Sequence, residues 1–293
     1  MQTRTIGDIT VTRVEEILGP GFLPTELYPD FQPDVLERHG DWLLPNHYHQ
    51  RSGRLIGSVH SWVVRTAHHT ILVDTCIGND KTRNGFPSWS NRQGPFLERL
   101  AEAGVAPEAV DFVLCTHLHV DHVGWNTRLL DGRWVPTFPK AKYLFARREY
   151  EHWLATEGRQ ADQRASDGSF GDSVLPVVEA GQAVLVEGDH AVDDGLVLAP
   201  APGHTPGHVT LKLASRDREG LFTGDIMHHP LQVYYPDWNS RFCTDPVQAR
   251  QTRRRVLEFC ADRRALMLPA HFGLPHAGRV SRQGNAFAFA FEP

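Results

Sequence analysis

Residues 116–124 carry three histidines and one aspartate directly after an apolar run, and this arrangement restricts the fold more than any other feature. The apolar run, residues 110–115, is typical of a buried strand. His117, His119, Asp121 and His122 follow within six residues, so a loop leaving the strand end can turn their side chains toward one point. Imidazole nitrogens and carboxylate oxygens are ligands for zinc and similar divalent ions. The segment predicts a metal site at a sheet edge, and a solvated His-rich loop is the minor alternative.

Three further candidate ligands, His204, Asp225 and His271, stand at the ends of other predicted strands. All candidates together make five histidines and two aspartates, which is too many for one four-coordinate zinc ion. Two divalent ions that share a bridging carboxylate would use such a set. We therefore expect two divalent metal ions as cofactors, with zinc favoured and iron, manganese or cobalt as alternatives.

The periodicity of apolar residues predicts a chain rich in strands, with helices between them. Strands are expected at residues 6–17, 58–66, 70–74, 110–115, 142–146, 183–186, 196–199, 209–213, 221–223, 266–268 and 286–291. Helices are expected at residues 95–103, 147–157 and 245–260. The runs from 183 to 223 are assigned to a second sheet. This pattern favours a single domain over residues 1–293, in which two sheets pack face to face with helices outside. Segments near 20–56 and 158–180 are expected to cover the site.

Composition and the start of the chain exclude several classes of protein. Thirty lysines and arginines stand against 35 aspartates and glutamates, so no basic field favours nucleic acid as a partner. No apolar run approaches the roughly 18–20 residues of a membrane span, and the first residues do not resemble a signal peptide. The four cysteines are far apart with no CxxC, which argues against a disulfide framework. We expect a cytoplasmic protein with no membrane partner.

The motif His-x-His-x-Asp-His at residues 117–122 resembles the signature of the metallo-β-lactamase superfamily of metal-dependent hydrolases. The resemblance implies an α+β fold, the four-layer αβ/βα sandwich, with the metals in a cleft at one edge of the two sheets. It implies that the first metal is held by His117, His119 and His204, and the second by Asp121, His122 and His271. By the same resemblance Asp225 bridges the two metals. The resemblance also implies that Asp74 orients ligand imidazoles without touching metal.

Residues 74–80 and 223–241 look most like the branch of acyl-homoserine lactonases and methyl parathion hydrolase. Zinc β-lactamases with a cysteine ligand would show it near Asp225, where this chain has none. We therefore expect a binuclear hydrolase that uses a metal-bound hydroxide to open a lactone or ester of a small, fairly apolar substrate. Asp121 and Asp225 are the predicted catalytic residues. Phosphotriester hydrolysis is the first alternative, followed by β-lactam or thioester hydrolysis and by diiron redox chemistry.

Other residues near the motifs are assigned supporting roles. His208 is expected to support the turn that carries His204, without binding metal. The candidate substrate contacts are His228, His229, Trp125, Tyr234 and Phe272. The expected partner is a small-molecule substrate, and a homodimer is left open. Two groups are expected to face solvent: the arginine run 253–255 and the histidines at 47, 49, 60, 68 and 69.

Overall fold

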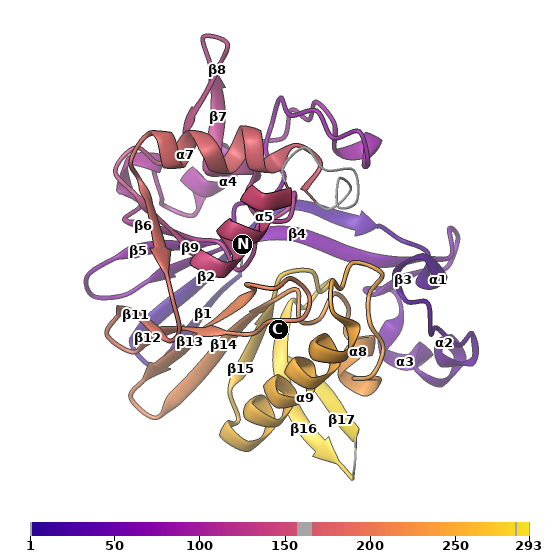
Figure 1. Cartoon of the computed structure of the whole chain (residues 1–293). Coiled ribbons are helices and arrows are strands. Elements are labelled where there is room, and N and C mark those ends of the chain that lie inside the picture. Colours follow the sequence, from indigo (N-terminus) through magenta and orange to yellow (C-terminus); the bar gives the residue numbers. More distant parts are fainter. Residues whose placement is uncertain (1, 157–165, 285, 293) are drawn as a thin grey trace.

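Two mixed β-sheets packed face to face form the centre of the molecule, in a computed structural model that describes residues 2–156, 166–284 and 286–292 (Figure 1). The first sheet has the order β1-β2-β4-β5-β6-β9-β10, with β3 paired to β4, and the second runs in sequence from β11 to β17. The strands of the first sheet are β1 (Thr3–Ile6), β2 (Ile9–Pro20), β3 (Tyr48–His49), β4 (Arg54–Arg65), β5 (Thr70–Val73), β6 (Phe112–Leu114), β9 (Lys142–Ala146) and β10 (Ala183–Val186). Those of the second are β11 (His190–Asp193), β12 (Leu196–Pro200), β13 (Val209–Ser215), β14 (Arg218–Gly224), β15 (Leu266–Pro269), β16 (Ala277–Gln283) and β17 (Ala286–Glu292). A separate hairpin, β7 (Thr127–Leu130) with β8 (Arg133–Pro136), projects from this body.

The alternation of side chains along each strand divides the apolar residues of the first sheet between two cores. Ile71 and Val73 of β5 point toward the second sheet, and Leu72 between them points away from it. The same alternation separates Leu114 from Val113 in β6. The second sheet adds a facing set of buried side chains to the inner core: Leu198, Leu211, Leu213, Phe222 and Leu268. Because both faces of the central strands are buried, their sequence reads as a continuous apolar run.

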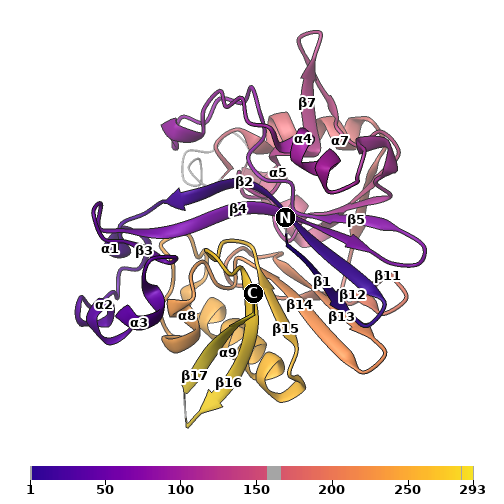
Figure 2. The ribbon, with the colours of Figure 1, turned by 180° about the vertical axis from the view of Figure 1, so that it is seen from behind.

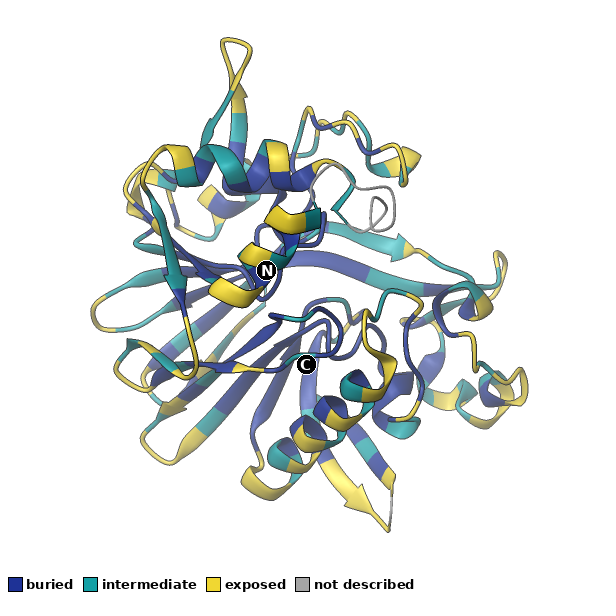
Figure 3. Cartoon of the chain, viewed as in Figure 1, coloured by how far each residue is buried: buried dark blue, intermediate teal, exposed yellow. Residues whose placement is uncertain are grey.

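Helices cover the outer face of each sheet and complete a four-layer αβ/βα sandwich. Helices α4 (Phe96–Glu102), α5 (Arg147–Thr156) and α7 (Leu175–Glu179) lie over the first sheet, and α9 (Pro246–Arg263) lies over the second. Their outward sides are exposed, whereas the strands beneath them are mostly buried (Figure 3). Asp245 caps α9, since its carboxylate accepts the backbone N–H groups of the second and third helical residues at 3.0 and 2.9 Å.

Short helices gather at one end of the sandwich, beside the long strands β2 and β4 (Figure 2). They are α1 (Pro24–Leu27), α2 (Asp34–Arg38), α3 (Gly40–Leu43) and α8 (Leu231–Tyr234). Leu27, Val35, Leu43 and Leu231 join them in one buried cluster.

The remaining described helical turns are the 3₁₀ helices Pro87–Trp89, Pro107–Ala109 and Gly124–Asn126 and the π-helical turn Phe170–Val174. None of the helices in the described part of the chain is both long and apolar enough to cross a membrane.

The predicted α+β sandwich is confirmed, with one strand assigned to the wrong sheet. Residues 183–186 form β10, which pairs in parallel with β9 of the first sheet, although the sequence pattern placed this run in the second. The reason is the connection, because α5 and α7 return the chain across the outer face of the first sheet, as a parallel pair requires. Residues 286–291, which were expected to form a strand, lie in β17. Phe287 and Phe289 are buried in the core between the second sheet and α9, which we call the outer core. Residues 157–165, where parts of the predicted helix and covering segment fall, lie outside the described residues.

Five strands end at the same edge of the sandwich, and each is followed by one of the conspicuous polar segments. Strands β5 and β6 run in parallel, and so do β14 and β15. Strand β12 shares the direction of β14, because both are antiparallel to β13. The loops after these strands therefore meet, which places Asp74, His117, His204, Asp225 and His271 close together.

Candidate metal centre

The first ligand group consists of His117, His119, His204 and Asp225, which are all buried. One potential ligand atom from each lies within 4.8 Å of the others. The Nδ1 atom of His119 is 2.9 Å from Nε2 of His204. One carboxylate oxygen of Asp225, Oδ2, lies 3.3 Å from Nε2 of His204 and 3.6 Å from Nε2 of His117. These atoms converge as ligands of one metal ion would.

The second ligand group consists of Asp121, His122 and His271. Nε2 of His122 lies 3.2 Å from Nε2 of His271, and each is 3.6 Å from an oxygen of Asp121. The Oδ1 atom of Asp225 is 2.8 Å from Nε2 of His271 and 3.3 Å from Nε2 of His122. The two oxygens of Asp225 therefore face different groups, which is the placement that a bridging carboxylate needs.

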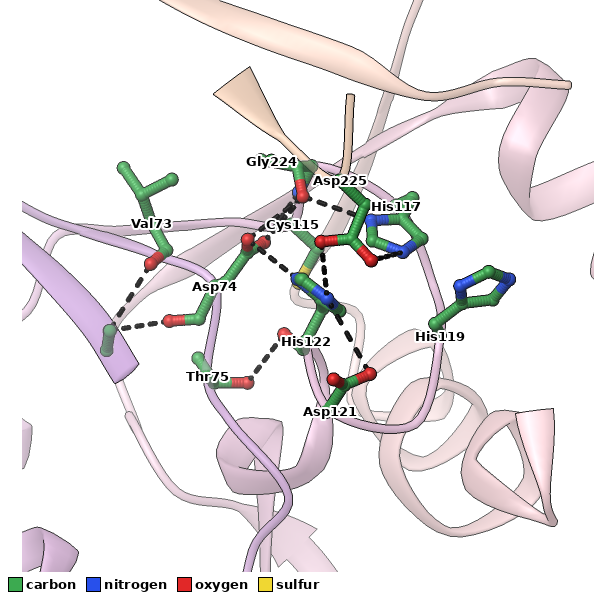
Figure 4. Close-up of polar contacts among 12 residues, drawn as sticks. Val73, Asp74, Thr75, Cys115, His117, His119, Asp121, His122, Gly224 and Asp225 are labelled. Carbon is green, nitrogen blue, oxygen red and sulfur yellow. Dashed lines mark hydrogen bonds and ion pairs between the residues drawn. The ribbon is translucent and has the colours of Figure 1, made fainter. Parts of the chain in front are cut away.

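Asp74 orients His122 from behind (Figure 4). Its Oδ2 atom lies 2.9 Å from Nδ1 of His122, and its Oδ1 atom accepts the backbone N–H of Thr116 at 2.7 Å. Asp74 itself has φ 59°, a left-handed conformation that aspartate tolerates better than most residues. The carboxylate thus holds the imidazole of His122 with Nε2 directed at the second group, and it also ties β5 to the loop after β6.

The hydrogen bonds of the two imidazoles in the second group test whether a metal ion fits. A carboxylate and a backbone carbonyl only accept, so Nδ1 of His122 donates to Asp74 and Nδ1 of His271 donates to the carbonyl of Ser58 at 2.9 Å. Both Nε2 atoms then present lone pairs at 3.2 Å, and only a cation, a proton or a metal ion, stabilises that contact. Two nitrogen ligands of a tetrahedral zinc ion lie about 3.3 Å apart. The residues present fit a metal ion.

Electrostatics at the site agree with this interpretation. Burial lowers the pKa of His117 and His119 well below the ordinary range, which keeps these rings neutral as metal ligands must be. Burial also opposes charge on His271, but the carboxylate of Asp225 outweighs it and raises the pKa of His271 to about 9. The pKa of His122 is raised for the same reason. Without metal the second group therefore attracts a proton, and a divalent ion would compete with that proton for the imidazole nitrogens.

The side chain of His208 contacts the backbone of Asp225. Its Nε2 atom accepts the N–H of Asp225 at 3.0 Å, and the ring is fully buried. Gly224 makes room for this contact, because a Cβ there would lie 2.6 Å from the same Nε2 atom. His208 is outside both ligand groups. Its side chain supports the backbone of Asp225, a contact that the sequence analysis did not predict.

A cavity of about 490 Å³ opens from the two ligand groups. His119, Asp121, Asp225 and His271 border it from both groups. Its far walls are mainly apolar side chains from several segments: Ile17, Phe22, Leu55, Phe86, Trp89 and Phe242. Residues 20–22, 26–27 and 54–56 of the expected covering segment 20–56 line the cavity, whereas the described residues of 158–180 do not. The volume and the lining are typical of a small-molecule site.

The candidate substrate contacts divide into two sets. His228 and His229 line the cavity, with Nε2 of His228 3.2 Å from Oδ2 of Asp225. Trp125, Tyr234 and Phe272 do not line it. The indole of Trp125 donates to Glu16 at 2.7 Å, and the other two rings pack in or against the outer core under the second sheet. Proximity in sequence to a motif did not determine on which side of the backbone these rings lie.

Several buried residues that support the site carry no motif signal. Arg253 was expected to face solvent but is fully buried, and it donates to the carbonyls of Ile226 and Pro236 at 2.8 and 2.7 Å. It thereby fixes the loop that follows Asp225. His47 and His60 are likewise buried, not exposed as expected, because tertiary contacts cover them. A charged run on a helix gives no sign of which member points inward.

The sandwich with two His/Asp groups at its edge defines the class of protein: a metal-dependent hydrolase. The sequence profile of the Metallo-beta-lactamase superfamily matches residues 55–271, and the chain belongs to this superfamily.

Curated relatives carry a more specific activity. An N-acyl homoserine lactonase of a Bacillus species is 29% identical over 161 residues, which cover 51% of this chain and 56% of the relative. An N-acyl homoserine lactonase of Bacillus cereus is 26% identical over 171 residues, 55% of this chain and 59% of the relative. The matches therefore span little more than half of each of these relatives.

Solved structures agree with the fold over almost the whole chain. The hydrolase AbOPH of the β-lactamase superfamily has a TM-score of 0.82 at 22% identity, covering 99% of this chain and 97% of its own. AidC, a dizinc quorum-quenching lactonase, has a TM-score of 0.75 at 19% identity, covering 100% and 97%. Likeness at these identities demonstrates the shared fold alone.

Proposed function

We propose that this chain is a binuclear metal-dependent hydrolase that opens a lactone ring on a small substrate with an apolar acyl chain. The observation that carries the proposal is that both ligand groups border one cavity whose far walls are apolar and aromatic. The relatives that are N-acyl homoserine lactonases support the choice of a lactone.

In the proposed site His117, His119 and His204 would hold one ion, Asp121, His122 and His271 would hold the other, and Asp225 would serve both. Divalent ions held in this way lower the pKa of water and polarise a carbonyl oxygen. Partner groups already hold His122, His271 and the backbone of Asp225 in place, so the protein supplies a preorganised environment for charge that develops during the reaction.

Asp121 is the proposed residue for handling the proton of the attacking water. It borders the cavity, and its side chain keeps 14% of its surface accessible, against 5% for that of Asp225. The two oxygens of Asp121 lie 3.6 Å from Nε2 of His122 and of His271. A carboxylate so placed can accept a hydrogen bond from water on the cavity side and orient it.

His228 is the proposed contact to the substrate oxygen. It borders the cavity, and its Nε2 atom lies 3.2 Å from Asp225 and 3.4 Å from Oγ of Ser240. An N–H at this position can donate to a carbonyl or leaving oxygen bound beside Asp225. His229 has a different part, because its Nε2 atom donates to the carbonyl of His47 at 2.9 Å.

The proposal is tested by kcat/KM on N-hexanoyl- and N-decanoyl-homoserine lactone beside an aryl phosphotriester. The protein is reconstituted with Zn²⁺, and a chelated sample is the control. We expect a preference for the lactones of tenfold or more, about 1.4 kcal/mol of transition-state binding, that disappears with chelator. A reversed preference would favour phosphotriester hydrolysis, and turnover that survives complete metal removal would contradict the metal mechanism.

A substitution in the cavity wall tests where the acyl chain of the substrate binds. Phe242 borders the cavity, where its ring lies 5.5 Å from that of Phe22. We expect Phe242→Ala to lower kcat/KM for the decanoyl substrate more than for the hexanoyl substrate. Tyr234→Ala is the control, since it also removes an aromatic ring and Tyr234 does not line the cavity. Equal losses on both substrates would contradict this placement of the chain.

A further inference from the structure

Two separate loops supply the histidines of the first ligand group. His117 and His119 lie after β6, and His204 lies between β12 and β13. These strands belong to different sheets, so the distance between the histidines depends on how the loops are held together. Nδ1 of His119 and Nε2 of His204 are only 2.9 Å apart, which leaves little tolerance for movement of either loop.

Glu149, in the first turn of α5, lies between these two loops and is 1% exposed. Its Oε1 atom accepts the backbone N–H of Leu118 at 3.1 Å and the indole N–H of Trp153 at 2.7 Å. Its Oε2 atom accepts the backbone N–H of Gly207 at 2.9 Å. Leu118 stands between the two histidines of one loop, and Gly207 follows His204 by three residues in the other. One buried carboxylate thus joins both loops.

The turn at Gly207 is shaped for this contact. A Cβ atom at Gly207 would lie 2.2 Å from the backbone nitrogen of Glu149 and 2.5 Å from its Cα atom. Only glycine lets the turn approach the start of α5 so closely. The helix, its glutamate and the His204 turn therefore pack as one unit.

We propose that Glu149 is a positioning residue that sets the separation of His119 and His204, and with it the metal affinity of the first ligand group. It touches neither metal nor substrate and acts through the backbone of the two loops. The inference rests on the proposed function in one respect, that the first group holds a metal ion.

The substitution Glu149→Gln tests this role at almost constant shape. The carboxylate accepts three N–H groups, whereas an amide presents one acceptor oxygen and one NH₂ donor. In either orientation of the amide, the NH₂ group faces at least one of the backbone N–H donors, and that loop is released. We expect one of the two Zn²⁺ affinities to fall by about tenfold or more, measured by competition with a chromophoric chelator.

Zinc occupancy in crystals equilibrated at limiting Zn²⁺, read by anomalous diffraction, identifies the group that is affected. We expect Glu149→Gln to lose occupancy at His117, His119 and His204 and to keep it at Asp121, His122 and His271. If Glu149→Gln does not fold, Glu149→Asp replaces it, because the shorter side chain keeps the charge but cannot reach both loops.

Glu16 provides a matched control within the same chain. It is also buried and also accepts two backbone N–H groups, from Ile77 and Gly78, and one indole N–H, from Trp125. Glu16→Gln removes the same chemistry from a place that does not contact the His204 loop and reaches the connection after β6 only at Trp125, beyond its histidines. We expect it to lower the melting temperature of the metal-free protein as Glu149→Gln does, without lowering zinc occupancy in the first group.

Trp153→Phe is the second control, because it removes the third donor to Glu149, leaves both loop contacts of Glu149 and keeps an aromatic ring beside that of His119, whose centroid lies 5.5 Å from the ring of Trp153. We expect unchanged zinc affinity in this variant. A folded Glu149→Gln protein with both zinc affinities and first-group occupancy at wild-type values would overturn the inference. A wild-type protein that does not bind two Zn²⁺ ions would instead refute the proposed function.

Discussion

Nε2 of His122 lies 3.2 Å from Nε2 of His271, and the other ring nitrogen of each imidazole already donates a hydrogen bond. The partners of these donors are the carboxylate of Asp74 and the carbonyl of Ser58. The two imidazoles are held with their Nε2 atoms toward each other, at an interplanar angle of 84°, by residues outside the two ligand groups. A cation at the second group is therefore expected to stabilise the folded chain and not only to support its activity.

Removal of metal is therefore expected to lower the melting temperature. A ligand bound by the folded state alone adds about 2.7 kcal/mol when its free concentration is 100 times its Kd. Thermal unfolding followed by circular dichroism, with Zn²⁺ and with excess chelator, measures the difference. An identical melting temperature in the two samples would contradict a structural contribution from the metal.

Substitution of Asp74 by asparagine is expected to weaken the second ligand group. The amide cannot accept from both the ring of His122 and the backbone of Thr116, the two contacts that the carboxylate makes. Loss of such a partner lowers metal affinity by about 10–100-fold, measured by chelator competition. Asp111→Asn is the control, since Asp111 accepts the N–H of Thr70 at the other end of the same strand pair. Equal effects of both substitutions would count against the role of Asp74.

His208→Ala is expected to reduce stability more than metal binding. The buried N–H of Asp225 loses its acceptor, which costs about 1–3 kcal/mol in the free energy of unfolding. Urea denaturation of the metal-free protein measures this cost, and zinc titration tests the site. Loss of zinc without any change in stability would show that His208 binds metal.

Acid is expected to destabilise the chain through His47, whose ring is buried and stacks on Phe291. Burial, with a smaller contribution from His229, lowers the pKa of His47 from 6.5 to about 3. Between these values the unfolded chain binds a proton that the folded chain does not. The stability from this group is therefore complete above pH 6.5 and falls as the pH drops toward 3.

The expected loss from His47 alone is about 1.6 kcal/mol between pH 6.5 and pH 5, because the slope approaches 1.36 kcal/mol per pH unit only below pH 6.5. His47→Phe keeps a ring against Phe291 and removes the proton, so its free energy of unfolding is expected to change less over this range. Denaturation at a series of pH values measures the slope, with exposed His68→Phe as the control. An unchanged slope in His47→Phe would contradict the prediction.

Local patterns in the sequence predicted the strands and helices well, because burial on one or both faces leaves a periodic trace. The strand expected at 110–115 and the helix expected at 245–260 are examples, since β6 forms at Phe112–Leu114 and α9 at Pro246–Arg263. The run at 183–186 was recognised as a strand but assigned to the wrong sheet. Four apolar residues specify an extended conformation, whereas the partner strand is chosen by the crossover that precedes them.

The sequence by itself determined the family and the sandwich. It also determined which seven residues are candidate ligands, because loops at the carboxyl ends of codirectional strands meet at one edge of the sandwich. Their roles toward metal stay predictions. Only the tertiary structure decided that Phe22, Phe86 and Phe242 border the cavity and that Trp125 does not. It alone placed Glu149 and Arg253 against the loops of the site. Such contacts join residues far apart in the chain, and their formation depends on packing between layers, which leaves no periodic trace in the sequence.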